Sequence, residues 1–286
     1  MATFSNQATL TYNGGVINSN IVTGEIIEVL SVTKNAVTNT YTTSDNVAYV
    51  ISIVNTGTTA FTNLTLTDDL GGYPFGTPPE TLYPLTYVDN SLLYYVNGTL
   101  QPTPIVTAGP PLTVSGISVP AGSNALIVYE AKANQYAPLG TDASITNTVT
   151  VTGGGLSAPI TDTETITADQ EALLSISKAI SPTTVADNGQ LTYTFVIENT
   201  ETTPAVATDN IVVTDTFDPI LDPISVTYDG VAWSEGVNYT YNELTGEFAT
   251  IAGQITIPAA TVAQDPVTGV WVITPGVGIL RITGTV

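Results

Sequence analysis

Residues 143–155 read ASITNTVTVTGGG, and a second copy of this stretch opens the chain at residues 2–15, ATFSNQATLTYNGG. Each copy places an asparagine, Asn147 or Asn6, ahead of an alternating polar and apolar run that ends in glycines. Alternation of period two is typical of a β-strand with one buried face. The chain therefore begins with a strand of a kind that reappears near its middle.

The sequence around these two stretches is also repeated. Both copies continue through a second alternating run into a lysine-bearing strand, EVLSVTK up to Lys34 and ALLSISK up to Lys178. The strands that follow, VAYVISIVNT (47–56) and LTYTFVIENT (191–200), also match, and Tyr49 aligns with Tyr193. The chain ends at GILRITGTV, which corresponds to residues 125–131. The second repeat is thus left without the strand that Asn147 supplies to the first.

Composition limits the classes of protein that fit. The chain has 286 residues with 43% hydrophobic residues, 24 Gly and 18 Pro, which suits short strands separated by turns. It has no Cys and no His, which excludes disulfides, thiol catalysis and the commonest metal ligands. We therefore expect no cofactor and no metal, since the acidic residues also lack the spacing of a calcium loop.

The charge is strongly negative. Four cationic residues face 25 acidic ones, a formal charge of −21, which repels nucleic acid and anionic membranes. No apolar run is long enough to span a bilayer, and no basic segment precedes an apolar core, so no signal peptide is recognisable. We expect neither a nucleic-acid partner nor membrane insertion.

Short strands with frequent turn signals predict an all-β chain of two tandem Ig-like antiparallel β-sandwiches, preceded by an N-terminal donor strand segment. Residues 1–27 are the donor extension. Residues 28–168 form the first sandwich, closed in cis by residues 142–168. Residues 169–286 form the second sandwich, which lacks its last strand and is completed by residues 2–27 of a neighbouring subunit.

The second repeat, SKAISPTTVADNGQLTYTFVIENT…NIVVTDTF, resembles the Ig-like "domain of unknown function 11" repeats of bacterial and archaeal surface proteins. The first repeat shares VTKNAV, the NTG at residues 55–57 and LTLTDDL. The resemblance implies a sandwich fold, a surface location and a structural or adhesive role. The chain is also similar to the pilin and collagen-adhesin domains that form internal Lys–Asn isopeptide bonds.

An isopeptide bond needs a neutral amine, an amide carbonyl and a proton donor, held together away from water. Burial lowers the pKa of a lysine and raises that of a carboxylic acid, so a dry site favours the reaction. In the first repeat, Lys34 and Asn147 are the predicted intramolecular cross-link and Asp68 the proton donor. A plain ion pair of Lys34 with Asp68, and a structural role for Asn147, are the alternatives.

In the second repeat the lysine and the acid are Lys178 and Asp215, and the asparagine is missing. We predict that Asn6 of a neighbouring subunit supplies it, so that Lys178 and Asn6 form an intermolecular cross-link with Asp215 as the proton donor. The donor strand would present one alternating face, made by Phe4, Ala8, Leu10 and Tyr12.

The sequence therefore predicts a structural subunit of an extracellular fibre, a pilus-like appendage of a cell or spore surface. Its partner is itself, in a head-to-tail homopolymer formed by donor-strand complementation and isopeptide cross-links. Apart from that autocatalytic step we expect no enzyme. The alternative is a surface adhesin module that binds glycan or protein. Its aromatic candidates are Tyr94, Tyr95, Trp233 and Trp271, although such residues more often fill sandwich cores and rims.

Overall fold

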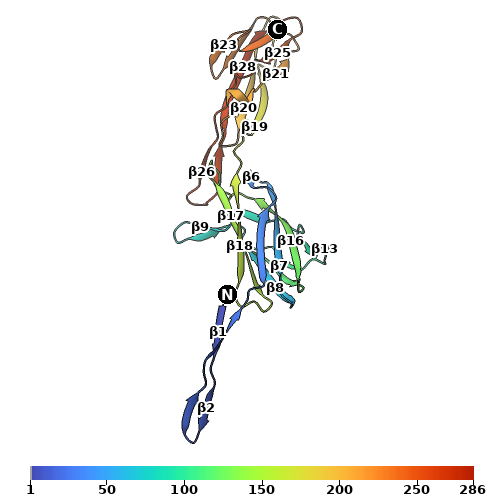
Figure 1. Cartoon of the computed structure of the whole chain (residues 1–286). Coiled ribbons are helices and arrows are strands. Elements are labelled where there is room, and N and C mark those ends of the chain that lie inside the picture. Colours follow the sequence, from blue (N-terminus) through green and yellow to red (C-terminus); the bar gives the residue numbers. More distant parts are fainter. Residues whose placement is uncertain (1) are drawn as a thin grey trace.

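The computed structural model describes residues 2–286, and this part of the chain is nearly all β-strand with one short 3₁₀ helix, η1 (Ala207–Asp209). The all-β prediction is confirmed. Figure 1 shows an elongated molecule in which three parts follow one another: an N-terminal hairpin (residues 2–26), body one (28–168) and body two (169–286). The two bodies are the two sequence repeats. No helix in the described part is long and apolar enough to cross a membrane.

Body one is a sandwich of two six-stranded sheets. The first sheet has the order β13 (Thr99–Leu100), β12 (Leu93–Val96), β16 (Ser123–Ala133), β7 (Asn46–Asn55), β5 (Leu30–Ala36), with β11 (Leu85–Tyr87) also on β16. The second has the order β14 (Ile105–Thr107), β15 (Leu112–Val119), β8 (Phe61–Asp68), β17 (Ser144–Gly153), β18 (Ile160–Ala168), β6 (Thr40–Tyr41). A small hairpin of β9 (Tyr73–Phe75) and β10 (Glu80–Leu82) stands apart from both. Strand β7 alternates as its sequence predicts, burying every second side chain from Val47 to Asn55.

Body two repeats the first sheet and only part of the second. Its first sheet has the order β19 (Leu174–Ser181), β20 (Gln190–Asn199), β28 (Gly276–Thr285), β22 (Ile224–Tyr228), β23 (Val231–Trp233). Its second has the order β21 (Thr214–Thr216), β25 (Glu247–Thr250), β24 (Tyr239–Asn242). Strand β8 of body one has β17 on one side, but no strand within residues 2–286 pairs with the corresponding side of β21.

The N-terminal hairpin pairs β1 (Ala2–Asn6) with β4 (Val22–Ile26) and β2 (Thr9–Tyr12) with β3 (Gly15–Asn18). Its tip is an Asn13-Gly14 turn with φ of 48° and 80°, the backbone that a tight right-twisted hairpin requires. Figure 1 shows the hairpin pointing away from body one at the end opposite body two. Within residues 2–286 its strands pair only with one another, and a lone two-stranded hairpin is only marginally stable in water.

The repeated Asn-Thr motif that ends β7 and β20 fixes a turn. Asn55 is buried and its Nδ2 donates to the carbonyl oxygens of Thr59 and Pro120 at 2.9 and 3.0 Å. Asn199 is buried too, and donates to the matching carbonyl oxygens of Thr203 and Pro258. The Asn-Thr motif, which carries part of the family resemblance, therefore has a structural role in this turn.

A further hairpin, β26 (Thr261–Gln264) with β27 (Trp271–Thr274), reaches from body two onto body one. The Trp271 backbone N–H donates to the carbonyl oxygen of Gln135, and Gln264 Nε2 donates to the Tyr73 hydroxyl, each at 3.0 Å. In body one, ISVPAG (117–122) runs directly into β16. In body two, the β26–β27 hairpin is inserted between the matching ITIPAA (255–260) and β28, so body one has no such hairpin.

Candidate functional site

Lys34, Asp68 and Asn147 come together between the two sheets of body one. Their exposed fractions are 2%, 0% and 0%, although each side chain is polar or charged. They belong to β5, β8 and β17, and each lies on the inward face of its strand, in line with apolar neighbours such as Val32 and Val149. The alternation that buries the core therefore buries these three side chains with it.

Asp68 is the centre of the polar contacts. Its Oδ2 lies 2.5 Å from Lys34 Nζ and accepts the Tyr129 hydroxyl at 2.6 Å. Its Oδ1 accepts the backbone N–H of Leu70 at 3.0 Å. Lys34 Nζ also lies 4.7 Å from the centre of the Tyr49 ring. The lysine amine is thus held between a carboxylate and an aromatic face.

Burial shifts the proton equilibria of this cluster. Desolvation lowers the pKa of Lys34 below its ordinary value of 10.5, although the Asp68 charge opposes the shift. Desolvation also raises the pKa of the Tyr49 and Tyr129 hydroxyls, so both keep their protons at neutral pH. A lysine with a lowered pKa gives up a proton more readily, which is the condition for acting as a nucleophile.

Asn147 has two buried polar atoms, Oδ1 and Nδ2, and neither has a hydrogen-bond partner. The side chain neighbours the hydroxyls of Tyr49 and Tyr129, and it acts to lower their pKa values against the larger, opposite effect of burial. Its position is fixed by the next residue, because Thr148 N–H donates to Asp69 Oδ1 at 2.8 Å and Asp69 N–H donates to Thr148 O at 3.0 Å. A buried polar group left unpaired costs about 1–3 kcal/mol. Such a group calls for a reason other than packing.

Body two holds the same lysine and acid in an open setting. Lys178 Nζ contacts Asp215 Oδ2 and lies 4.4 Å from the centre of the Tyr193 ring. Their side chains are 41% and 18% exposed, compared with 0% for Lys34 and Asp68. These two contacts are the ion pairs found within residues 2–286. Within residues 2–286 no asparagine takes the place of Asn147, because β21 pairs with β25 and with no strand on its other edge.

The empty edge leaves a whole face of β19 uncovered. In β5, the residues flanking Lys34 on its face are Val32, which is 9% exposed, and Ala36, which is half-buried and packs against the core. The matching residues of β19, Ile176 and Ile180, are 56% and 39% exposed. The β17–β18 hairpin covers the β5 face of body one, where Lys34 N–H donates to Asp162 Oδ2 of β18 at 2.7 Å.

The free N-terminal hairpin has the pattern of β17–β18. Asn6 pairs with Val22 across the hairpin as Asn147 pairs with Glu164. The alternating donor residues Phe4, Leu10 and Tyr12 are 55%, 62% and 71% exposed, and Ala8 is exposed as well. When Asn6 is aligned with Asn147, Phe4, Ala8 and Leu10 correspond to Ile145, Val149 and Val151 of β17, which are buried, and Tyr12 corresponds to Gly153. The sequence prediction named one strand of this segment as the donor, and the structure shows a two-stranded hairpin.

Two tyrosines of the site had no role in the sequence prediction. Tyr49 was matched with Tyr193 across the repeats, which is a signal that could have drawn attention to it. Tyr129 gives no such signal, because β16 and β28 place Tyr129 opposite Tyr49 but Ile282 opposite Tyr193.

The candidates for other functions lie elsewhere. No group of three His, Cys, Asp or Glu within residues 2–286 is placed to hold a metal ion. Tyr94 is buried, Tyr95 is half-buried and Trp233 stacks on Tyr228 with ring centres 5.0 Å apart. Trp271 lies at the contact of the two bodies. These aromatic residues do not form a common surface in the chain.

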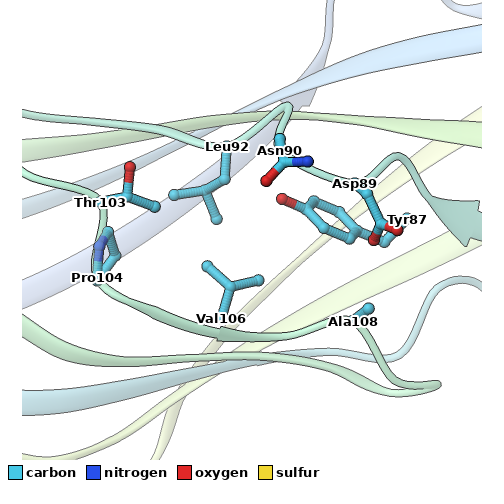
Figure 2. A pocket seen from close by; sticks show the side chains of 8 residues that line it. All are labelled: Tyr87, Asp89, Asn90, Leu92, Thr103, Pro104, Val106 and Ala108. Carbon is cyan, nitrogen blue, oxygen red and sulfur yellow. The ribbon is translucent and has the colours of Figure 1, made fainter.

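Figure 2 shows a hollow of about 360 Å³ in body one. Tyr87, Leu92 and Val106 contribute apolar walls, and Asp89 and Asn90 contribute polar groups. One lining residue, Tyr87 of β11, has its ring centre 6.2 Å from that of Tyr129 in the Lys34 cluster.

No family model and no curated protein matches this chain. Among solved structures, it is similar to BcpA, the major pilin subunit of Bacillus cereus, with 10% identity over 96% of this chain and 73% of that one, and a TM-score of 0.35. A 35 kDa C-terminal fragment of the major pilin GBS80 of Streptococcus agalactiae has 10% identity over 87% and 91%, with a TM-score of 0.36.

A family 123 glycoside hydrolase from Clostridium perfringens also matches, with 9% identity over 50% of this chain and a TM-score of 0.30. This chain spans 28% of that enzyme and 55% of the similar pilus backbone protein RrgB from Streptococcus pneumoniae. All of these TM-scores are below 0.5, so the sandwich architecture rests on the strand pairing described above and not on these matches.

Proposed function

We propose that the chain is the structural subunit of a surface fibre, which polymerises head to tail when the N-terminal hairpin of one subunit completes body two of the next. The observation that carries the proposal is the mismatch between the two bodies. Body one has a hairpin, β17–β18, on the edge of β8, body two has an empty edge, and the chain presents an exposed hairpin of the same pattern. An unpaired edge beside exposed apolar side chains is a surface that soluble proteins avoid.

Body one supplies the register for the docked hairpin. In that body Val149 pairs with Asp68, and Asn147 lies two residues before it on the same face of β17. The same arrangement in body two would pair Ala8 with Asp215. Asn6 would then face Lys178 of the receiving subunit, and Phe4, Leu10 and Tyr12 would cover the exposed face of β19.

The arrangement of the parts favours a neighbouring chain over self-closure. The hairpin leaves body one at the end opposite body two, so it points away from its own empty edge (Figure 1). The hairpin runs through residues 27–29 into β5, just as β18 runs through residues 169–173 into β19. Repeating one connection along the chain of subunits gives a head-to-tail contact that does not close, which generates an open filament.

The same docking would create a cross-linking site. In body one, Asp68 takes a proton from the Lys34 ammonium, and the neutral Nζ adds to Cγ of Asn147. Asp68 then passes a proton from the attacking nitrogen to Nδ2, which leaves as ammonia. One C–N bond forms and one breaks, and the surplus proton leaves with the ammonia as ammonium. Lys178, Asp215 and Asn6 would react in the same way between subunits.

The unpaired Asn147 amide supports this chemistry over a plain ion pair. An ion pair of Lys34 and Asp68 needs no asparagine, and it would leave Oδ1 and Nδ2 buried without partners. The reaction removes Nδ2 altogether and turns the asparagine carbonyl into part of a new amide. The resemblance to the "domain of unknown function 11" repeats and to isopeptide-forming pilin domains agrees with an extracellular cell or spore appendage.

The test uses the full chain and a variant without residues 2–26. We expect the full chain to form filaments by negative-stain microscopy, ladders that survive boiling in detergent, and an Asn6–Lys178 linked peptide on digestion. The variant should stay monomeric. A synthetic peptide of residues 2–26 should then add to it covalently, with a mass gain of the peptide less one ammonia, and Lys178→Met should prevent that addition.

The alternative function, an adhesin module, predicts a different outcome. Discrete two-lobed particles for the full chain, with no binding of the peptide to the shortened variant, would exclude the fibre. The hollow in Figure 2 would then be the place to look for a glycan or peptide ligand.

A further inference from the structure

The hydroxyl of Tyr49 is a buried donor without a partner. Tyr49 is 0% exposed, and its Oη makes no hydrogen bond. The Asn147 side chain is its neighbour, and the Oδ1 atom of that amide is also unpaired. The Tyr49 hydroxyl and the Asn147 amide are thus neighbours in a dry site, and neither group has another partner.

We propose that Tyr49 is a catalytic residue whose hydroxyl donates to Oδ1 of Asn147 as Lys34 Nζ adds to Cγ, and so stabilises the negative charge that develops on that oxygen. The inference rests on the proposed isopeptide reaction and adds a group to it. The O–H bond of Tyr49 stays intact throughout, so the proton balance through Asp68 is unchanged. A fixed donor aimed at an oxygen that becomes anionic acts strongly where water is excluded.

The other phenol of the site is committed elsewhere. The Tyr129 hydroxyl donates to Asp68 Oδ2 at 2.6 Å, so it orients the acid. The backbone amide nearest to the acid, that of Leu70, is used on Asp68 Oδ1. The Tyr49 hydroxyl is therefore the donor beside Asn147 that makes no hydrogen bond to another group. Burial raises the pKa of its hydroxyl, which keeps the proton available for donation.

The repeat carries the same tyrosine to the second site. Lys34 Nζ lies 4.7 Å from the Tyr49 ring centre, and Lys178 Nζ lies 4.4 Å from that of Tyr193. In body one, Tyr49 lies opposite Tyr129 of β16. In body two, Tyr193 lies opposite Ile282 of the corresponding strand, β28. The tyrosine under the lysine is therefore common to both sites, and Tyr129 is not. Tyr193 would serve the intermolecular bond as Tyr49 serves the intramolecular one.

The test measures the rate of ammonia loss in a full chain that carries Asn6→Ala, so that the bond within body one is the one observed. The chain is made by cell-free synthesis and its intact mass is followed with time. We expect Tyr49→Phe to slow the mass loss about 100-fold, the effect of removing one such donor. Tyr136→Phe in the same chain is the matched control, at a half-buried tyrosine of body one outside the Lys34 cluster, and should leave the rate unchanged.

A second measurement separates catalysis from packing. In a Lys34→Met background no bond can form, and there Tyr49→Phe should leave the melting temperature unchanged or raised, because the hydroxyl has no partner to lose. In the chain with Asn6 intact, Tyr193→Phe should slow ladder formation and spare the bond within body one.

The outcomes separate the two levels of inference. Equal rates for Tyr49→Phe and its parent, with the parent losing one ammonia, would overturn the role of Tyr49 and leave the cross-link standing. A parent that keeps its full sequence mass would instead overturn the proposed reaction itself. A large fall in melting temperature in the Lys34→Met background would show that the hydroxyl supports packing and overturn the catalytic role.

Discussion

Lys34 and Lys178 occupy the same place in the two bodies, yet the side chain of Lys34 is 0% exposed and that of Lys178 is 41% exposed. Both amines contact an aspartate and lie over a tyrosine ring, so the local sequence builds the same unit twice. The difference arises from one element, the β17–β18 hairpin, which body one has and body two lacks. A strand that covers the β21 edge and supplies an asparagine opposite Lys178 should therefore convert the second site into the first.

The two faces of the hairpin give the sharpest test of docking. Leu10 shares the face of Asn6, and Thr11 lies on the opposite face, as successive strand residues do. Both are exposed in the free hairpin, so Leu10→Lys and Thr11→Lys should leave the monomer's melting temperature unchanged. We expect Leu10→Lys to abolish filaments, because a charge would be buried against β19, and Thr11→Lys to permit them. Equal polymerisation of the two variants by light scattering would contradict the proposed docking.

The cross-link in body one should be a large part of that body's stability. Lys34→Ala or Asn147→Ala removes the bond, and each should keep the variant at its full sequence mass. A bond that closes a loop of about 100 residues restricts the unfolded chain much as a disulfide does, an effect of about 3–5 kcal/mol.

Lys132→Ala is the matched control, because Lys132 is exposed on β16 and makes no ion pair within residues 2–286. It should lose one ammonia as the parent does and melt at the parent's temperature. If Lys34→Ala unfolded at the parent's denaturant midpoint, no cross-link would be present.

Much of this site was predictable from sequence, for a physical reason. Lys34, Asp68 and Asn147 each stand in an alternating strand where a polar residue replaces a core residue, and the first two recur in the second repeat. The all-β class follows from the same alternation. Nothing in that pattern marks Tyr129, since its counterpart is Ile282 and the contact with Asp68 depends on how the two sheets face each other.

The hairpin form of the N-terminus and the β26–β27 insertion were also not predicted. A strand pattern gives the face that is buried, but the partner of each strand depends on turns and register. In the second strand of the N-terminal hairpin, Val22 stands where β18 has Glu164, so the two hairpins share little side-chain identity there. Their similarity became visible only from the pairing.

Alkaline pH should accelerate cross-linking. Burial lowers the pKa of Lys34, and the reactive form is the neutral amine, so the rate of ammonia loss should rise with pH and level off below the ordinary lysine pKa of 10.5. The measurement is the mass time course of the Asn6→Ala chain at several pH values. A rate that is flat across that range would show that the proton on Lys34 does not limit the reaction.

The same shift has a consequence for stability when the bond is absent. In Asn147→Ala, Lys34 is free, and its folded pKa lies below its unfolded pKa. Between these two values the unfolded chain binds more protons, so the free energy of unfolding should increase as pH rises. The double variant Asn147→Ala, Lys34→Met is the control and should lack this component of the increase.

The β26–β27 hairpin should set the stiffness of the joint within each subunit. Gln264 Nε2 donates to the Tyr73 hydroxyl at 3.0 Å, and Trp271 packs at the same contact, where it influences the pKa of Tyr73. Replacing both by alanine removes the Gln264 hydrogen bond, about 1 kcal/mol, and the Trp271 side-chain packing, and keeps the backbone bond from residue 271 to Gln135 O and residues 169–173. We expect small-angle X-ray scattering of the shortened, monomeric variant to show a broader range of overall dimensions, with the melting of each body unchanged.

Val272→Ala, at a residue 52% exposed on the same strand, is the control and should leave the scattering curve as it was. If the double alanine variant scattered identically to its parent, the orientation of the bodies would have to be fixed by the linker itself.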